Sequence, residues 1–403
     1  MPIYLDYAAT TPVDPAVAAC LAACLTHDGL FGNPASATHG FGRAAAAAVE
    51  QARAQVAALL GAHADEIIWT SGATEANNLA LCGALRGTRK GRHLITAQSE
   101  HKAVLDVCRH LEREGCTVTW LTPDRDGLID PQQVAAALRP NTALVSLMHV
   151  NNETGVIQDL ATIAALTQAR GILLHVDAAQ SVGKLPIDLS TLPIDLLSVS
   201  AHKLYGPKGI GALYVRRRPR PVRLDALLHG GGQERGLRPG TLPVHQIVAF
   251  AEACRIAGER MATEPARIAV LRERLWRALQ PLGAVERNGH PEHCVAGILN
   301  LSFHGISAEA LLAALPDIAL STGSACTSTS TALSHVLRAM GRDAFAARAA
   351  VRFSLGRFTT PEDIDTTISA VRIAVTRLRN LSPLWTDTGR LLPADTVDWA
   401  AVP

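Results

Sequence analysis

Apolar segments of strand length alternate with helix-like segments through the first two-thirds of the chain. Between the strands, alanine-rich stretches predict helices such as 43–60, which Gly61 would end, and 131–139, with Asp130 as N-cap and Pro131 at the first helical position. Strands that are apolar along nearly their whole length are typical of a mostly parallel sheet buried between helices. The predicted strands are 66–70, 93–97, 117–121, 143–150, 172–178, 196–200 and 211–215.

A second unit follows this sheet. A long amphipathic helix, from about 243 to 278, would lead into it, and strands of its own are predicted at 297–303 and 351–356. A chain of 403 residues also favours two domains over one core. We therefore expect a large domain over residues 15–260 and a smaller α/β domain formed by 1–14 and 261–403.

Composition excludes few classes of protein, but the net charge and the length of the apolar runs limit the kinds of partner that we expect. Hydrophobic residues make up 48% and charged residues 18% of the chain, and the net charge is only +2. The basic run 216–223 is short and broken by prolines, so we expect an exposed turn and no direct nucleic-acid contact. No apolar stretch approaches the roughly 20 residues that span a bilayer, and the N-terminus lacks a basic signal-peptide region. We expect no membrane contact and a cytoplasmic location.

The 8 cysteines contain no C-x-x-C pair, which suits reduced thiols better than a disulfide framework or a metal site. Most are expected to be small core residues. Cys326 differs because its segment, 321–330, is almost entirely small and hydroxylic. A thiol there is either a nucleophile that reaches into a site or an uninvolved surface cysteine.

Lys203 follows the apolar stretch 194–200 and precedes a Gly-Pro-Lys-Gly turn. Burial disfavours a charged amine, and a deprotonated lysine is a nucleophile for carbonyls. Such a lysine can hold pyridoxal phosphate as a Schiff base. The alternative is a strand-end lysine that reaches water.

Other chemical residues also follow predicted strands, where ligands of open α/β sheets bind. Ala73 and Thr74 lie where a small-residue turn becomes a helix, and such a helix start either binds a phosphate or is an ordinary N-cap. Asp177 would face a pyridinium nitrogen or cap a helix, and Gln180 could reach the phenolic oxygen of the cofactor.

Further candidates complete this site. His101 begins a helix after a strand and could stack on a flat ring and move protons. Asn152 offers donors to a cofactor or substrate oxygen, and Ser200 and His202 could donate to a phosphate. Arg352 is suited to binding a carboxylate through two hydrogen bonds, although a structural salt bridge is an equal use of such an arginine.

Taken together, these segments resemble the cysteine desulfurases, specifically the IscS/NifS-type group of the class V aminotransferase-like family. The resemblance covers essentially the whole chain. It implies a pyridoxal-phosphate-dependent transferase fold, similar to aspartate aminotransferase, with a mostly parallel mixed sheet between helices and a smaller α/β domain. The motifs that carry it are LDYAATTPVDP, FGNPAS, SGATE, EHKAVLD, MHVNNE, HVDAAQSVGKLPIDLS, HKLYGPKGIGALYVRR, HGGGQERGLRPGTLPVHQ, SAC and RFSLGRFT.

The resemblance also implies roles for the candidate residues. Lys203 would hold pyridoxal phosphate, with Asp177 on the ring nitrogen, Gln180 on the phenolic oxygen and His101 stacked on the ring. Phosphate would be bound by Ala73, Thr74, Ser200 and His202, with Thr241 reaching across from the other subunit of a homodimer. Asn152, Arg352 and Asn33 would hold the substrate, L-cysteine.

Cys326 would take the substrate's sulfur as a persulfide and release L-alanine. The acceptors implied are an iron–sulfur scaffold protein, whose cluster Cys326 could transiently ligate, and other sulfur-acceptor proteins. Three positions depart mildly from the commonest family pattern, namely Ala179, Ala201 and Thr322. The alternatives are an aminotransferase, a lyase preferring selenocysteine and a non-enzymatic relative. Cys326 argues against the aminotransferase, and the intact Lys203, His101, Asp177 and Cys326 argue against the non-enzymatic relative. A preference for selenocysteine stays open.

Overall fold

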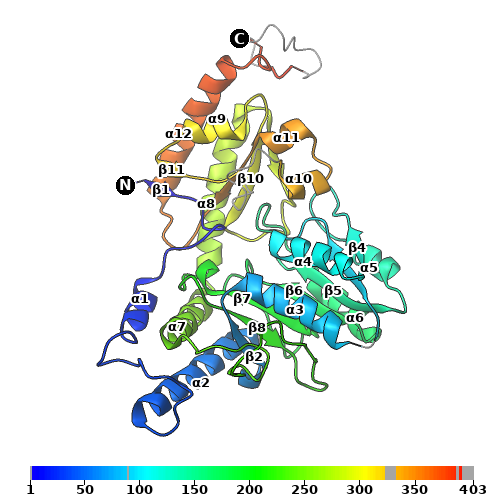
Figure 1. Ribbon diagram of the computed structural model, residues 1–403. Coiled ribbons are helices and arrows are strands. Elements are labelled where there is room, and N and C mark those ends of the chain that lie inside the picture. Colours follow the sequence, from blue (N-terminus) through cyan, green and yellow to red (C-terminus); the bar gives the residue numbers. More distant parts are fainter. Residues whose placement is uncertain (1, 89, 323–332, 387–389, 393–403) are drawn as a thin grey trace.

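The computed structural model describes residues 2–88, 90–322, 333–386 and 390–392. Its largest element is a seven-stranded sheet with the strand order β2-β8-β7-β6-β5-β3-β4 (Figure 1). β8 is antiparallel to both of its neighbours and the remaining pairs are parallel. The predicted mostly parallel mixed sheet is therefore confirmed. Its strands are β2 (Ile67–Thr70), β3 (His93–Ala97), β4 (Thr117–Leu121), β5 (Thr142–Met148), β6 (Leu173–Asp177), β7 (Leu196–Ser200) and β8 (Gly211–Val215).

Successive residues of these strands enter two different cores. Ile67 and Trp69 belong to one hydrophobic cluster, while Ile68 between them belongs to another. Side chains alternate across a pleated strand, so each face needs its own cover of helices. Helices α3 (Ala73–Gly87) and α4 (Lys102–Arg113) cover one face. The other face is covered by α1 (Pro15–Ala22), α2 (Gly40–Leu60), α5 (Pro131–Ala137), α6 (Leu160–Ala169) and α7 (Val244–Arg260).

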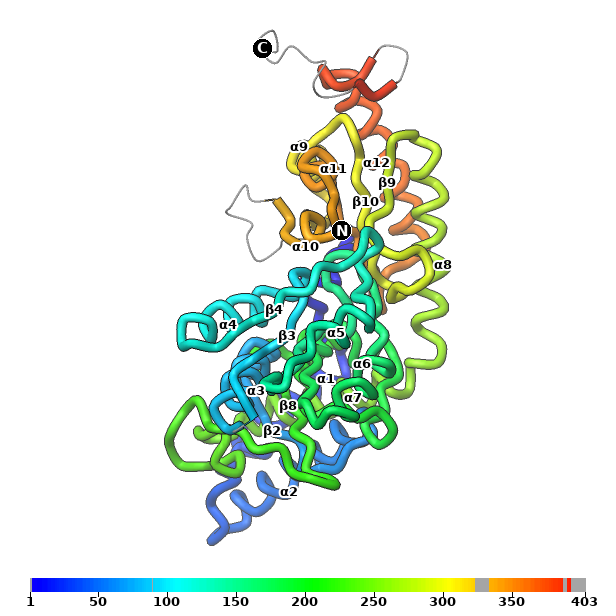
Figure 2. Tube along the Cα trace, turned by 90° about the vertical axis from the view of Figure 1, so that its right-hand side faces the viewer, coloured from blue at the N-terminus to red at the C-terminus, as the bar shows by residue number. Residues whose placement is uncertain are grey.

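A second, three-stranded antiparallel sheet has the order β12-β10-β9 and lies above the large sheet in Figure 1. It has a separate hydrophobic cluster, drawn from Leu5 and from residues 268–375. The tube in Figure 2 shows α8 and α12 along one side of this unit. Its elements are α8 (Glu264–Leu279), β9 (Val285–Asn288), β10 (Ile298–Phe303), α9 (Ala308–Ala313), α10 (His335–Ala339), α11 (Ala344–Arg348), β12 (Ala350–Ser354) and α12 (Pro361–Asn380).

The N-terminal segment joins the two units. Strand β1 (Ile3–Tyr4) pairs in parallel with β11 (Ile318–Ala319) beside the small sheet. The chain then passes below that sheet and reaches α1 in the large unit. Separate cores on either side of residue 260 are in keeping with the domain boundary expected from the sequence, which stays a prediction. The described part of the chain also forms three short 3-10 helices, namely η1 (Ala64–Glu66), η2 (Ala201–Lys203) and η3 (Gln280–Leu282).

One predicted element is wrong. The single helix expected from 243 to 278 is two helices, α7 and α8, separated at Met261–Thr263. Pro265 lies in the first turn of α8. Proline has no backbone N–H and its ring clashes with the carbonyl four residues earlier, so a continuous helix cannot pass through this position.

Two helix ends that single residues predict are confirmed. The Asp130 side chain accepts a hydrogen bond from the Gln132 N–H at the start of α5, and Gly61 ends α2 with a φ of 63°, where glycine is least strained. The seven cysteines that the structure describes are all free, and five of them are buried. Within the described ranges, no helix is both long and apolar enough to cross a membrane.

Candidate functional site

A cavity of about 590 Å³ lies where the carboxyl ends of several large-sheet strands meet the small unit. Ten of the residues predicted from the sequence line it together, although they come from distant parts of the chain. The cavity thus lies beyond the carboxyl ends of strands, where ligands of open α/β sheets usually bind. These ten are Ala73, Thr74, His101, Asn152, Asp177, Gln180, Ser200, His202, Lys203 and Arg352.

Lys203 lies in η2, directly after β7, and is half-buried. Its Nζ donates to the carbonyl oxygens of Ala8 and Ala9, at 2.5 and 2.7 Å. These acceptors come from the N-terminal segment, more than 190 residues earlier in the chain. Two backbone carbonyls therefore hold the amine at the cavity wall.

Asp177 ends β6 and is only 5% exposed. Its Oδ2 accepts from Asn77 Nδ2 at 2.8 Å, and its Oδ1 accepts from the Ala179 N–H at 3.0 Å. No arginine or lysine forms an ion pair with it among the residues that the structure describes. A buried carboxylate held only by neutral donors is suited to a cationic ligand group, because burial without a counter-charge is costly.

Helix α3 begins at the cavity. Its N-cap residue is Gly72, which has no side chain that could accept a capping hydrogen bond. The first-turn N–H groups of Ala73 and Thr74 therefore donate to no N-cap side chain. The positive end of the helix dipole and these donors favour an anion. Ser200, which is buried at the end of β7, lines the same part of the site.

Two histidines differ in their surroundings. His202 is held through Nδ1 by Thr10 Oγ1 at 3.1 Å, and burial, with the nearby Lys203 charge, lowers its pKa to about 4. It is therefore a neutral imidazole near pH 7 when no ligand is bound. His101 caps α4, and its Nδ1 accepts from the Ala103 N–H at 3.1 Å. Accepting at Nδ1 leaves Nε2 as the protonated nitrogen that can face the cavity.

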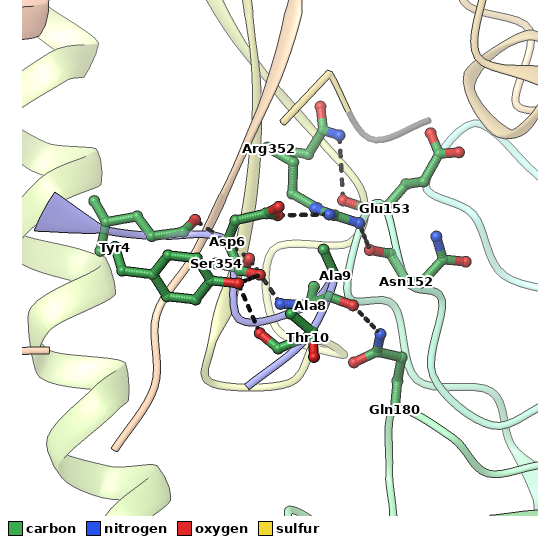
Figure 3. A network of polar contacts seen from close by, with 12 residues as sticks. Tyr4, Asp6, Ala8, Ala9, Thr10, Asn152, Glu153, Gln180, Arg352 and Ser354 are labelled. Carbon is green, nitrogen blue, oxygen red and sulfur yellow. Dashed lines mark hydrogen bonds and ion pairs between the residues drawn. The ribbon is translucent and has the colours of Figure 1, made fainter. Parts of the chain in front are cut away.

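Arg352, in β12, brings the small unit into the site (Figure 3). Its guanidinium donates to Asp6 Oδ1 at 2.8 Å and to the Asn152 carbonyl at 2.7 Å. The side chain is only 1% exposed, and its Nε has no partner in the described part of the chain. A salt bridge and a cavity-lining position thus occur in the same arginine, so the two uses predicted from the sequence do not exclude each other.

Three predicted residues are not brought into this site. Asn33 is exposed and its side chain accepts from the Ala35 N–H, away from the cavity lining. Thr241 is also exposed and outside the lining, but its expected role is in the site of the other subunit. Cys326 lies outside the described residues. The roles of all three stay predictions.

The sequence analysis missed several lining residues. Ala8 and Ala9 contribute backbone carbonyls from the N-terminal segment, a role that side-chain type cannot signal, and Thr10 contributes the hydroxyl that holds His202. Asn77 follows Thr74 by about one helical turn, so the helical period was the available signal for it. Glu153 is buried, accepts from Ser334 Oγ at 2.5 Å, and has a pKa raised by burial.

The donor set fits pyridoxal phosphate. Three complementary parts surround one cavity: a carboxylate for a ring nitrogen, an uncapped helix start for a phosphate, and a lysine amine for an aldehyde. The Asn77 Oδ1 that has no described partner lies beside this carboxylate, so the site holds polar capacity that the protein itself does not use. Among the described residues, no group of three or more His, Cys, Asp or Glu side chains could hold a metal ion.

Comparisons with known proteins agree with this geometry. The family model described as Aminotransferase class-V matches residues 3–367. The chain is 57% identical, over 401 residues and 99% of both chains, to the cysteine desulfurase IscS of Pectobacterium atrosepticum, and equally similar to that of Escherichia coli. Among solved structures, a NifS-like protein has a TM-score of 0.86 at 36% identity, covering 94% of this chain and all of its own. A protein described as SspA in complex with cysteine has a TM-score of 0.78 at 40% identity, covering 89% of this chain and all of its own.

Proposed function

The chain belongs to the class V aminotransferase family and, within it, to the cysteine desulfurases, and from this premise we propose how its cavity carries out that reaction. We propose that pyridoxal phosphate binds in the cavity and that L-cysteine is converted there to L-alanine. The observation that carries this assignment is the placement of Lys203, Asp177 and the α3 N-terminus around one 590 Å³ space. Each alone has a structural explanation, but the three together match the three ends of one cofactor.

The protein's contribution to cofactor binding follows from these positions. Asp177 would hold the ring nitrogen in its protonated form, because the carboxylate is buried and has no ion-pair partner among the described residues. The N–H groups at the start of α3, with Ser200 and His202, would bind the phosphate. Bound in this way, the cofactor supplies an electron sink for bonds to the substrate's α- and β-carbons.

The remaining residues hold the substrate and move protons. Arg352 and Asn152 would orient the α-carboxylate, with Arg352 using the part of its guanidinium that faces the cavity. Since its Nδ1 is occupied by the Ala103 N–H, His101 would exchange protons through Nε2. Lys203 would be a second group able to move a proton at the substrate.

The sulfur step needs a nucleophile, and we assign it to Cys326. Its thiolate attacks the substrate's sulfur, a new S–S bond forms, and the C–S bond breaks with its electron pair going to carbon. Protonation of that carbon gives alanine and leaves a persulfide on Cys326. A thiol or protein acceptor then takes the outer sulfur atom, and we propose an iron–sulfur scaffold protein among these acceptors.

Two further properties are proposed by resemblance. A homodimer is required if Thr241 completes the phosphate site of the other subunit, and its mass in solution would be twice 42.6 kDa. The cytoplasm is the proposed location, since the described cysteines are free thiols.

The direct test uses purified protein with L-cysteine and a reducing thiol. Alanine and sulfide should appear in equal amounts, and the protein should be yellow. Lys203→Ala should lose the yellow colour, because the amine that binds the aldehyde is gone. Lys90→Ala, at a lysine remote from the cavity that binds two backbone carbonyls, is the matched control and should stay yellow.

Cys326→Ser separates cofactor chemistry from sulfur transfer. This variant should remain yellow and change its absorption when cysteine is added, but should release no sulfide. Normal sulfide release by this variant would show that Cys326 takes no part in the reaction. If the unaltered protein formed alanine without sulfide or persulfide, desulfuration itself would be refuted.

A further inference from the structure

Lys184 is a charged residue beside the site that the proposed mechanism does not use. It follows the turn after β6, and its Nζ donates to Gln180 Oε1 at 2.8 Å. The Gln180 amide nitrogen in turn donates to the Ala8 carbonyl oxygen at 2.8 Å. Lys184, Gln180 and Ala8 thus form a chain of hydrogen bonds that ends at the carbonyl which also accepts from Lys203 (Figure 3 shows the Gln180–Ala8 part).

This chain determines which way the Gln180 amide faces. A carbonyl only accepts, so the Ala8 oxygen must meet the amide nitrogen, and Lys184, which in its protonated form only donates, meets the amide oxygen. Both ends therefore select the same orientation. The amide nitrogen carries two hydrogens, of which Ala8 uses one, and the second is left for a ligand in the cavity that Gln180 lines.

Lys184 is placed at some cost to the folded protein. It lines a second, smaller cavity of about 50 Å³ behind Lys203, together with Tyr7, Glu264 and Arg357. No carboxylate forms an ion pair with it within the described ranges. Burial and the charges of Lys203 and Arg352 lower its pKa to about 7. A lysine in such surroundings lowers the stability of the fold, and a perturbed group beside a cavity is a candidate for a functional role.

We propose that Lys184 is a positioning residue: by holding the Gln180 amide oxygen, it turns the Gln180 NH₂ group toward the phenolic oxygen of bound pyridoxal phosphate. The inference rests on the proposed function, since it assumes that cofactor. It assigns Lys184 no contact with the substrate or cofactor. Its effect passes entirely through Gln180.

The consequence is a shift in the cofactor's visible spectrum. A hydrogen bond donated to the phenolic oxygen reduces the negative charge on that oxygen. This charge stabilises the protonated form of the nitrogen that would link Lys203 to the cofactor. Losing this donor should therefore raise the pH midpoint of the colour change. It should also weaken cofactor binding by about fivefold, the size of one ordinary hydrogen bond.

A double-mutant cycle in the cofactor-loaded enzyme tests the proposal. Lys184→Met and Gln180→Met should each raise the pH midpoint by about half a unit to one unit, as one lost hydrogen bond predicts. The double variant should shift no further than Gln180→Met alone, because both changes remove the same donor. Lys184→Arg, which keeps a donor, should restore most of the normal midpoint. Lys90→Met is the control and should behave as the unaltered protein.

The outcomes separate the inference from the function on which it rests. Shifts that add in the double variant would mean that Lys184 acts through its charge or the fold, and would overturn the proposal, as would an unchanged midpoint in Lys184→Met. If Lys184→Met does not fold, Lys184→Leu, which also lacks a donor, takes its place in the same cycle and must give the same non-additive shift. An unaltered protein without bound cofactor would instead refute the proposed function itself.

Discussion

At the scale of single residues, Arg352 combines a structural ion pair with a place in the cavity wall. The guanidinium is 1% exposed, and its ion pair with Asp6 and its bond to the Asn152 carbonyl are both partly buried. These contacts lock the guanidinium at the cavity wall before any substrate arrives. A side chain held in this way loses little further entropy when a carboxylate binds to it.

Arg352→Ala should raise the KM for cysteine by about 10- to 100-fold, the range expected for lost charge-assisted hydrogen bonds. Arg352→Lys keeps the charge but loses the planar guanidinium, so its KM should lie between that of the unaltered protein and that of Arg352→Ala. Steady-state kinetics with cysteine would measure this. Because Asp6 is left without its partner, the thermal unfolding midpoint of each variant must be measured alongside, and an unchanged KM in a folded Arg352→Ala protein would assign the carboxylate to another residue.

The residue scale also shows what a sequence can and cannot signal. Lys203 and Asp177 could be identified because a charged residue at the end of an apolar strand is unusual. The Ala8 and Ala9 carbonyls could not, since every residue has such a group and only the fold brings two of them to Lys203. Asn77 gave a weak signal through its helical spacing from Thr74.

At the scale of elements, the loop after β5 connects the site to the small unit. Gly155 has a φ of 80°, and a Cβ added there would lie 2.9 Å from Ile298 Cβ in β10. Its carbonyl accepts from the Val295 N–H at 2.9 Å. Asn152 and Glu153, which line the cavity, precede it in the same turn. The close approach of backbone to β10 therefore places these two residues.

Gly155→Ala should cost more stability than Gly115→Ala. Both glycines have positive φ, 80° and 86°, but a Cβ at Gly115 would meet nothing within 4 Å. Gly115→Ala should therefore cost only the backbone strain, about 1–2 kcal/mol. Gly155→Ala adds overpacking against Ile298, for a total of about 2–5 kcal/mol.

Denaturant unfolding of the two variants measures this difference. Equal losses would show that β10 yields to the extra methyl group and that the close approach does not matter. Because Asn152 and Glu153 lie in the same turn, Gly155→Ala should also weaken cysteine binding, whereas Gly115→Ala should not.

Helix boundaries illustrate the limit of periodicity at this scale. The apolar period continues from α7 into α8, so the pattern predicts one helix where there are two. Pro265 was the available signal for the break. By contrast, Asp130 and Gly61 act within a few residues, and the ends they predict are confirmed.

At the scale of the whole molecule, buried histidines couple stability to pH. His175 is fully buried between Ser146 Oγ and Ser198 Oγ, at 2.8 and 3.0 Å, and His149 is 8% exposed. Burial lowers the pKa of each to about 4. In the unfolded chain the pKa of histidine is about 6.5, so between these values only the unfolded state takes up the protons.

Stability should therefore be fully present above about pH 6.5 and fall as the pH is lowered toward 4, by up to about 1.4 kcal/mol per pH unit for each such histidine. Glu100 and Glu153 act in the opposite direction, because burial raises their pKa values and folded carboxyls then hold protons that the unfolded chain releases. Comparing the pH dependence of stability between a histidine variant and the unaltered protein therefore isolates the contribution of that histidine from these opposing groups.

His175→Asn should lower the overall stability but reduce its slope between pH 5 and 6. His27→Asn, at an exposed histidine, is the control and should leave the slope unchanged. Denaturant unfolding at several pH values measures both. A slope that His175→Asn does not alter would show that His175 is not the group taking up the proton.

Contacts between distant segments also hold the whole molecule together. Arg357, after β12, forms ion pairs with Asp14 at 2.7 Å and with Glu264 at 2.9 Å, and its guanidinium lies 4.0 Å from the centre of the Tyr205 ring. Tyr205 lies two residues after Lys203. The junction of the two units is thus packed directly beside the lysine that would hold the cofactor.

The sequence by itself determined the alternation of strands and helices, the mostly parallel sheet, and the strand ends that carry Lys203, Asp177 and Ser200, because these depend on local periodicity and on the rarity of charge in apolar runs. Only the tertiary structure decided that the Ala8 and Ala9 carbonyls accept from Lys203, that Asn77 donates to Asp177, and that Lys184 donates to Gln180. These contacts join segments or groups whose proximity depends on how the two cores pack, and no pattern within a short stretch of chain encodes that packing.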